Sequence, residues 1–157
     1  MRAYRYIVSR ELQDKHAKMK RDPFEFLRGT YYRWAQLWPE VCPESKQDPI
    51  ALSVGDLHID SYGTWRDVEG RMCWGVDDFD EAWPLPYTND LTRLAASVKI
   101  ARKLAILSIR TKHACGIIFK MYERTLREDG CPIVLAEEET HLKKLGIESL
   151  KPAKSFW

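Results

Sequence analysis

Apolar residues recur at helical spacing in the second half of the chain, where they predict two long helices. The first is capped by Thr88 or Asn89 and carries one apolar stripe, made of Leu91, Leu94, Ala95, Val98, Ala105 and Ile109. The second runs from about Lys112 to Arg127, stops near Gly130, and has an expected inward face of Ile117, Ile118, Met121 and Leu126. A short charged helix is predicted from Glu137 to Leu145.

The first half of the chain shows shorter helical segments. Residues 10–20 are strongly charged, and we expect residues 1–22 to form an exposed helical arm. Pro23 begins a second segment that ends at Gly29. Residues 31–38 then predict an aromatic-rich helix.

Strand signals lie between these two groups of helices. The apolar run from Ile50 to Val54 predicts a buried strand that delivers a loop. Residues 64–76 read as a β-hairpin around the turn residues 67–70, and Pro84 and Pro86 force an extended passage. Helices, a small hairpin-containing sheet and further helices indicate an α+β fold, and 157 residues fit a single domain.

Six carboxylates fall in two short turn-like segments on either side of the hairpin: Asp56, Asp60, Asp77, Asp78, Asp80 and Glu81. Because a hairpin returns the chain to its starting end, we expect Asp56 and Asp78 to be neighbours in space. Clustered carboxylates repel one another, and each raises the pKa of the next unless a cation or donor intervenes. The cluster therefore predicts a metal site or a site of phosphate chemistry.

Composition narrows the choice of partners and compartment. The formal charge is +2, from 25 basic and 23 acidic residues, so a generic nucleic-acid binder is not expected. No apolar run approaches the ~20 residues that span a bilayer, and the first residues lack the apolar core of a signal peptide. The cysteines are scattered without C-x-x-C spacing, which indicates reduced thiols and a cytoplasmic protein.

Three interpretations compete for the carboxylates. In the first, Asp56 is a base near a substrate hydroxyl and Asp78 holds Mg²⁺ that bridges nucleotide phosphates. In the second, Asp56 and His58 begin a two-metal phosphoesterase site that Asp78 or Asp80 completes. In the third, Asp56 and Asp78 cap turns, His58 is a hydrogen-bonded core residue, and there is no chemistry.

Four ordered blocks resemble the DUF2252 family of bacterial proteins. They are DPFEFLRGT at 22–30, GDLH at 55–58, DFDEA at 78–82 and NDLTRLAAS at 89–97. That family is similar to the aminoglycoside phosphotransferase and protein-kinase-like superfamily. The resemblance implies a kinase-like fold, consisting mainly of the catalytic-loop hairpin and C-lobe helices. It also implies Mg²⁺ and ATP as cofactors and an acceptor hydroxyl of unknown identity.

The resemblance also implies residue roles. Asp56 would be the catalytic base, with His58 beside it in the catalytic block, and Asp90 would buttress the catalytic loop. Arg28, beside Gly29, is a candidate phosphate contact or a salt-bridge partner of a nearby carboxylate. The implied metal ligands are Asp78, Asp80 and Ser61, and Ser61 would also contact the nucleotide.

The chain departs from that superfamily in ways that favour a second interpretation. Ser61 stands where the superfamily places Asn, and neither a Gly-rich phosphate loop nor a strand lysine is evident. The chain is also shorter than a complete family member. The alternative is a non-catalytic, pseudokinase-like module. A shortened lobe would leave apolar faces of 99–109 and 112–127 uncovered, so we expect a homo-oligomer or a partner chain.

Overall fold

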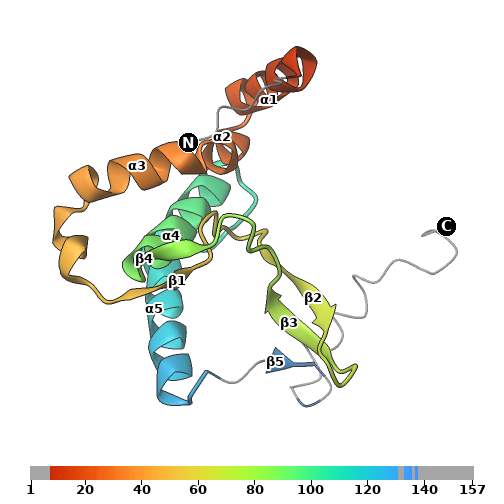
Figure 1. Cartoon of the computed structure of the whole chain (residues 1–157), viewed down its shortest axis with the longest axis vertical. Coiled ribbons are helices and arrows are strands. Elements are labelled where there is room, and N and C mark those ends of the chain that lie inside the picture. The colour runs from red at the N-terminus through yellow and green to blue at the C-terminus, as the bar shows by residue number, and fades with distance from the viewer. Residues whose placement is uncertain (1–7, 131–132, 136, 138–157) are drawn as a thin grey trace, which may run out of the picture.

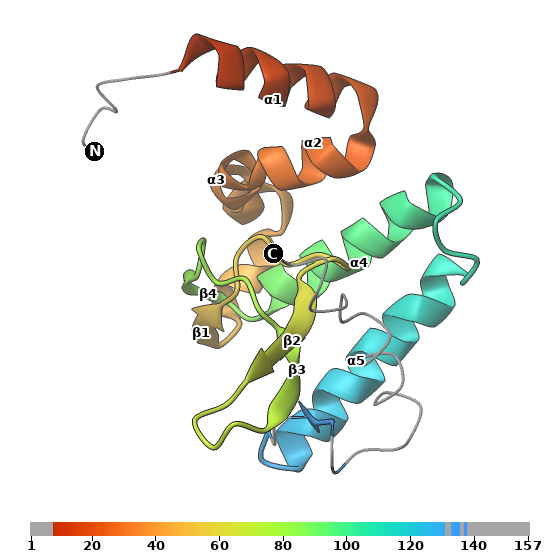
Figure 2. The same ribbon diagram turned by 90° about the vertical axis from the view of Figure 1, so that its right-hand side faces the viewer.

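The computed structural model describes residues 8–130, 133–135 and 137. Its N-terminal part is helical, and α1 lies across α2 on the outside of the molecule, with no buried residue of its own (Figures 1 and 2). The elements of this part are α1 (Ser9–Arg21), α2 (Pro23–Gly29), α3 (Tyr31–Val41) and the 3₁₀ turn η1 (Pro43–Gln47).

The start of α2 follows from its sequence. The Asp22 carboxylate accepts a hydrogen bond from the Phe24 N–H at 2.7 Å, which satisfies one of the free donors of the first turn. Pro23 occupies the first helical position, where its missing N–H costs nothing. Phe24 and Leu27 are buried, so this short helix contributes to the core.

The strands form two small antiparallel sheets, as expected for an α+β fold (Figure 1). β1 (Ile50–Ser53) pairs with β4 (Trp83–Pro86), with Ile50 opposite Pro86. β2 (Tyr62–Arg66) pairs with β3 (Met72–Val76), and β3 also pairs with β5 (Ile133–Val134). The hairpin predicted over residues 64–76 is confirmed, and its strands begin two residues earlier.

The prediction of a buried strand at residues 50–54 is wrong. β1 has β4 as its strand partner, and Ile50 and Leu52 are 62% and 73% exposed. Ser53 is the buried residue of this strand. An apolar run alone does not distinguish a buried central strand from an exposed strand of a two-stranded sheet.

α4 (Thr88–Lys103) is the central element of the core. It ends earlier than its predicted stripe, because Ala105 adopts a left-handed conformation with φ of 60° and the chain leaves the helix there. Its buried residues are Asn89, Leu91, Arg93, Leu94, Ser97, Val98 and Ala101. α2 and α5 (Thr111–Arg127) both pack against it.

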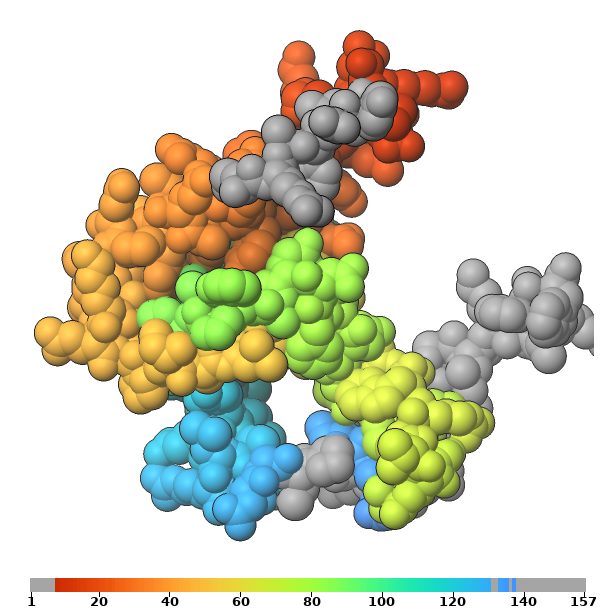
Figure 3. All heavy atoms as spheres, viewed as in Figure 1, coloured from red at the N-terminus to blue at the C-terminus, as the bar shows by residue number. Residues whose placement is uncertain are grey.

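The face of α5 that was predicted to point inward is instead largely open. Ile117, Met121 and Leu126 are 45%, 46% and 62% exposed, and Ala114 is the buried residue of this helix. Figure 3 shows a hollow between α5 and the β2–β3 hairpin, where apolar residues line a cavity of about 620 Å³. The prediction that residues 112–127 leave an apolar face uncovered is confirmed.

Two sequence predictions concern other parts of the chain. The charged helix predicted from Glu137 to Leu145 lies outside the described residues, apart from Glu137 itself. In the described ranges, no helix has the length and apolar character required to cross a membrane.

Candidate functional site

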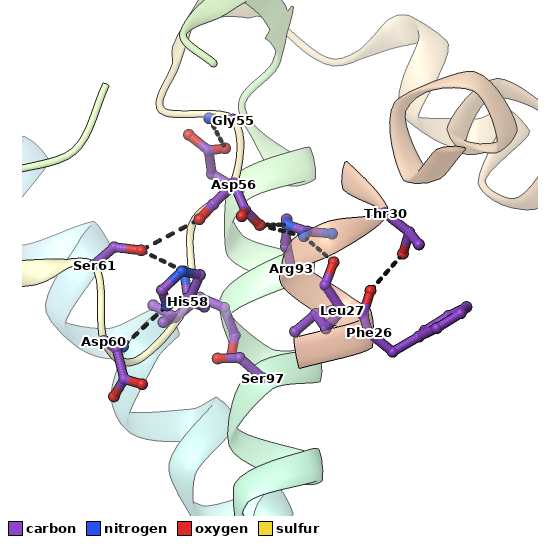
Figure 4. A network of polar contacts seen from close by, with 12 residues as sticks. Phe26, Leu27, Thr30, Gly55, Asp56, His58, Asp60, Ser61, Arg93 and Ser97 are labelled. Atoms are coloured by element: carbon purple, nitrogen blue, oxygen red, sulfur yellow. Dashed lines mark hydrogen bonds and ion pairs between the residues drawn. The ribbon is translucent and has the colours of Figure 1, made fainter. Parts of the chain in front are cut away.

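The loop between β1 and β2, residues 54–61, is held by one face of α4 (Figure 4). The Asp90 carboxylate accepts hydrogen bonds from the N–H groups of Val54 at 2.7 Å and Gly55 at 3.2 Å. The Ser97 hydroxyl accepts another from the Ile59 N–H at 3.2 Å. The predicted role of Asp90 as a carboxylate that buttresses this loop is confirmed.

Arg93, one turn along from Asp90, holds Asp56. Its Nε–H donates to Asp56 Oδ1 at 2.9 Å, Nη2 contacts the same oxygen, and Nη2 also donates to the Leu27 carbonyl at 2.7 Å. The Arg93 side chain is fully buried. Its guanidinium lies 4.9 Å from the centre of the Tyr31 ring and 5.1 Å from that of Trp34, within the range of cation–π attraction.

This ion pair involves one of the two carboxylate oxygens of Asp56. Oδ1 is occupied by Arg93, whereas Oδ2 forms no hydrogen bond within the described part of the chain. The Asp56 side chain is 18% exposed and lines a cavity. One carboxylate oxygen is therefore fixed from behind while the other remains available to a ligand.

The carboxylates predicted to be neighbours do share one cavity of about 700 Å³. Asp56 reaches it from the loop and Asp78 from the acidic turn, so the two predicted acidic segments meet at one cavity. Arg28 enters from α2, and α1 covers another side. The other predicted site residue in this cavity is Asp80, and Glu81 lies there as well.

Gly55 allows the loop and the acidic turn to approach so closely. Its φ is +98°, a conformation that L side chains rarely adopt. A Cβ at this position would lie 2.4 Å from the Glu81 carbonyl oxygen. The backbone of Glu81 is thus packed directly against the residue that precedes Asp56.

The crowding of charges in this cavity acts on Glu81. Burial raises the pKa of the Glu81 carboxyl, and the neighbouring charges of Asp56, Asp78 and Asp80 raise it further. A cation bound among these groups would relieve that repulsion.

His58 and Ser61 lie behind the loop, outside the lining of this cavity (Figure 4). The His58 N–H donates to Ser61 Oγ at 3.0 Å, and Ser61 Oγ donates to the Asp56 carbonyl at 3.2 Å. His58 Nδ1 accepts from the Asp60 N–H at 3.1 Å, and its ring meets Phe24 edge-on. Burial lowers the pKa of His58, so the ring is held neutral. Both side chains therefore support the loop.

The carboxylates of this cavity suit a metal ion that takes its remaining ligands from water or from a bound phosphate. Among the described residues, no three His, Cys, Asp or Glu side chains converge to hold an ion unaided. Asp78 Oδ1 accepts the Asp80 N–H at 3.2 Å, which places both side chains on one tight turn. Mg²⁺ in nucleotide sites takes one or two carboxylates and completes its shell with water and phosphate oxygens. Asp78 and Asp80 fit that pattern.

Arg93 was missed as a functional residue, although the sequence contained a signal for it. Asp90, Arg93 and Ser97 are spaced three and four apart, which places them on one helical face beside the apolar stripe. An arginine so close to an apolar stripe is buried only when an acid meets it. No local rule identifies that acid as Asp56, 37 residues earlier.

We expect Arg93→Met to lower the free energy of unfolding by roughly 3–5 kcal/mol, because it leaves the charge of Asp56 without its partner. Asp56→Asn alone should also destabilise, and the double variant should lose less than the sum of the two. Arg102→Met, an exposed position on the same helix, is the matched control. Urea denaturation measures all four, and strictly additive effects would contradict the pairing.

We expect Glu81→Gln to stabilise the protein progressively as pH rises. The folded-state pKa of Glu81 is raised, so its contribution is fully present below the ordinary glutamate range and is lost as pH climbs through the folded value. The melting-temperature difference between variant and wild type should therefore grow from pH 4 to pH 7. Glu40→Gln, exposed on α3, should show no such trend. A difference that is constant with pH would contradict the crowding.

Comparison with known proteins identifies the family. No curated protein and no solved structure matches this chain. A family described as "Uncharacterized protein conserved in bacteria (DUF2252)" matches residues 5–152, which include all four sequence blocks and the cavity described above. The chain belongs to the DUF2252 family.

Proposed function

We propose that this chain is a Mg²⁺-dependent phosphotransferase that moves the γ-phosphoryl group of ATP to a hydroxyl acceptor. The observation that carries the proposal is the position of the Asp56 carboxylate. Arg93 fixes it through one oxygen, and it lines a cavity together with Asp78 and Asp80. The kinase-like interpretation of the fold belongs to this proposal. Its support is the contact of Asp90 with the loop, which the resemblance led us to expect.

In this proposal each residue of the cavity has one role. Asp56 Oδ2 accepts a hydrogen bond from the acceptor hydroxyl and orients its oxygen toward the phosphoryl group. Oδ2 takes the hydroxyl proton as the new P–O bond forms and the bond to ADP breaks. Asp78 and Asp80 hold the metal. Mg²⁺, when bound, neutralises the charge that develops on the phosphate oxygens. Arg93 acts through Asp56 as a positioning residue, and His58 and Ser61 maintain the shape of the loop.

The ion pair suits this reaction. A carboxylate that a guanidinium binds through one oxygen is held in a fixed orientation. Phosphoryl transfer depends chiefly on positioning and charge neutralisation. An anchored carboxylate that orients a hydroxyl group therefore fits such a reaction.

The first test is the response to ligand of wild type and Asp78→Asn. Mg²⁺ with ATP should raise the melting temperature of wild type by mass action, and Asp78→Asn should abolish the metal-dependent part. Without ligand, Asp78→Asn should be slightly stabilising, because one repelling charge is removed. ATP turnover should fall by ~10²–10⁴ in Asp56→Asn, the usual contribution of a positioned base.

Two controls keep this test sharp. Glu40→Gln removes one acidic charge outside the cavity and should respond to Mg²⁺ and ATP as wild type does. Asp56→Asn loses its ion pair with Arg93, so its turnover is measured below its own melting temperature, with circular dichroism confirming the fold. Equal Mg²⁺ responses in wild type and Asp78→Asn would remove Asp78 from the site. Turnover unchanged in Asp56→Asn would end the phosphotransferase proposal.

A second candidate function, a binding module that acts through partners, is favoured by the open face of α5. Ile117, Met121 and Leu126 are 45%, 46% and 62% exposed on this helix, and exposed apolar surface of this kind marks association sites. Sedimentation velocity should show self-association that Leu126→Glu weakens, whereas Glu128→Gln, an exposed change on the same helix end, should not. A monomer across a hundredfold concentration range would contradict self-association.

A further inference from the structure

Two groups of elements line the charged cavity. The acidic side is formed by the loop and the acidic turn, and consists of Asp56, Asp78, Asp80 and Glu81. The basic side is formed by α1 and α2, and its cations are Lys15, Lys18 and Arg28. Three further carboxylates line the cavity from these helices, Glu11, Asp14 and Glu25, so its charge as a whole is negative.

The basic side chains line the same cavity as the acidic side without pairing with it. Within the described part of the chain, no ion pair joins Lys15, Lys18 or Arg28 to any carboxylate within 4.0 Å. Opposite charges that line one hollow without pairing leave room for a ligand carrying both signs. Because the cavity is negative overall, it repels a free phosphate anion, and a divalent cation that enters with the phosphates reduces that repulsion.

The position of α1 over this cavity is set by direct packing. A Cβ built on Gly29 would lie 2.6 Å from the Met19 sulfur and 3.2 Å from Cε of Lys15. Any larger side chain at this position would therefore meet the ends of the Met19 and Lys15 side chains. Lys15 thus lies close to Gly29, and both residues line the cavity.

We propose that Lys15 and Lys18 of α1, together with Arg28, bind the phosphates of the magnesium complex of a nucleoside triphosphate. This inference rests on the proposed function, and it assigns the phosphate contacts to an N-terminal helix. The phosphate oxygens face the basic side while the cation lies against the acidic side. The α1 lysines thereby provide positive charge that no lysine supplies from the strands of the described residues.

The test is isothermal titration of the full chain with Mg²⁺–ATP and, separately, with Mg²⁺–tripolyphosphate. The variant is Lys15→Gln/Lys18→Gln. Its matched control is Lys20→Gln/Arg21→Gln, which removes the same charge from exposed positions of α1 that do not line the cavity. Both ligands should bind the first variant about tenfold or more weakly, since each lost contact is a charge-assisted hydrogen bond. The control should bind within about twofold of wild type.

Gly29→Val supplies an independent variant, because its bulk would displace the ends of the Lys15 and Met19 side chains while leaving every charge in place. It should also weaken both ligands. If wild type binds both ligands and the lysine variant binds them equally well, the phosphate assignment is overturned while the proposed function stands. If wild type binds ATP but not tripolyphosphate, recognition lies in the nucleoside and the assignment is likewise overturned. Absence of binding by wild type would overturn the proposed function, and the assignment with it.

Discussion

The contact on which the site depends is the buried ion pair between Arg93 and Asp56. A fully buried guanidinium is tolerated because a carboxylate, a main-chain carbonyl and two aromatic rings surround it. Desolvating two charges costs several kcal/mol, and good geometry offsets that cost only while both partners remain. The core therefore cannot keep Arg93 unless the loop keeps Asp56 in place. Stability and the shape of the candidate site are set by the same interaction, with Asp90 and Ser97 fixing the loop on either side of it.

That arrangement also limits the chemistry available to Asp56. Arg93 occupies one oxygen of the carboxylate and fixes the orientation of the other, so the residue is suited to orienting a hydroxyl group. The proposed reaction also needs a charge-neutralising partner, and a divalent cation would be most favoured at the crowded carboxylates of Asp78, Asp80 and Glu81. In the proposed reaction, the anchored carboxylate of Asp56 would position the acceptor, and the cluster of repelling carboxylates would hold the cation that neutralises charge.

Local patterns predicted the parts of this structure that local physics determines. The hairpin follows from turn residues around Asp67, whose carboxylate accepts the N–H groups of Glu69 and Arg71. The approach of Asp56 to Asp78 follows from the hairpin. The exposure of β1, and of the α5 face that was expected to point inward, could not be predicted, because exposure depends on what packs against these elements. For Arg93, the sequence predicts the helical face on which it lies, but its partner Asp56 is determined by the tertiary structure.

The same loop separates two cavities of opposite character. Val54 and Leu57 line the apolar hollow beside α5, whereas Asp56, between them, lines the charged cavity. If this loop could move, a partner that covered the apolar cavity would also change the shape of the charged cavity. The contacts from α4 oppose this, because Asp90 and Arg93 hold the residues on both sides of the Gly55–Asp56 peptide. The charged cavity is therefore formed by the chain itself, and a partner on α5 would leave Asp56 where α4 places it. Binding through α5 and chemistry at Asp56 are thus compatible in one molecule.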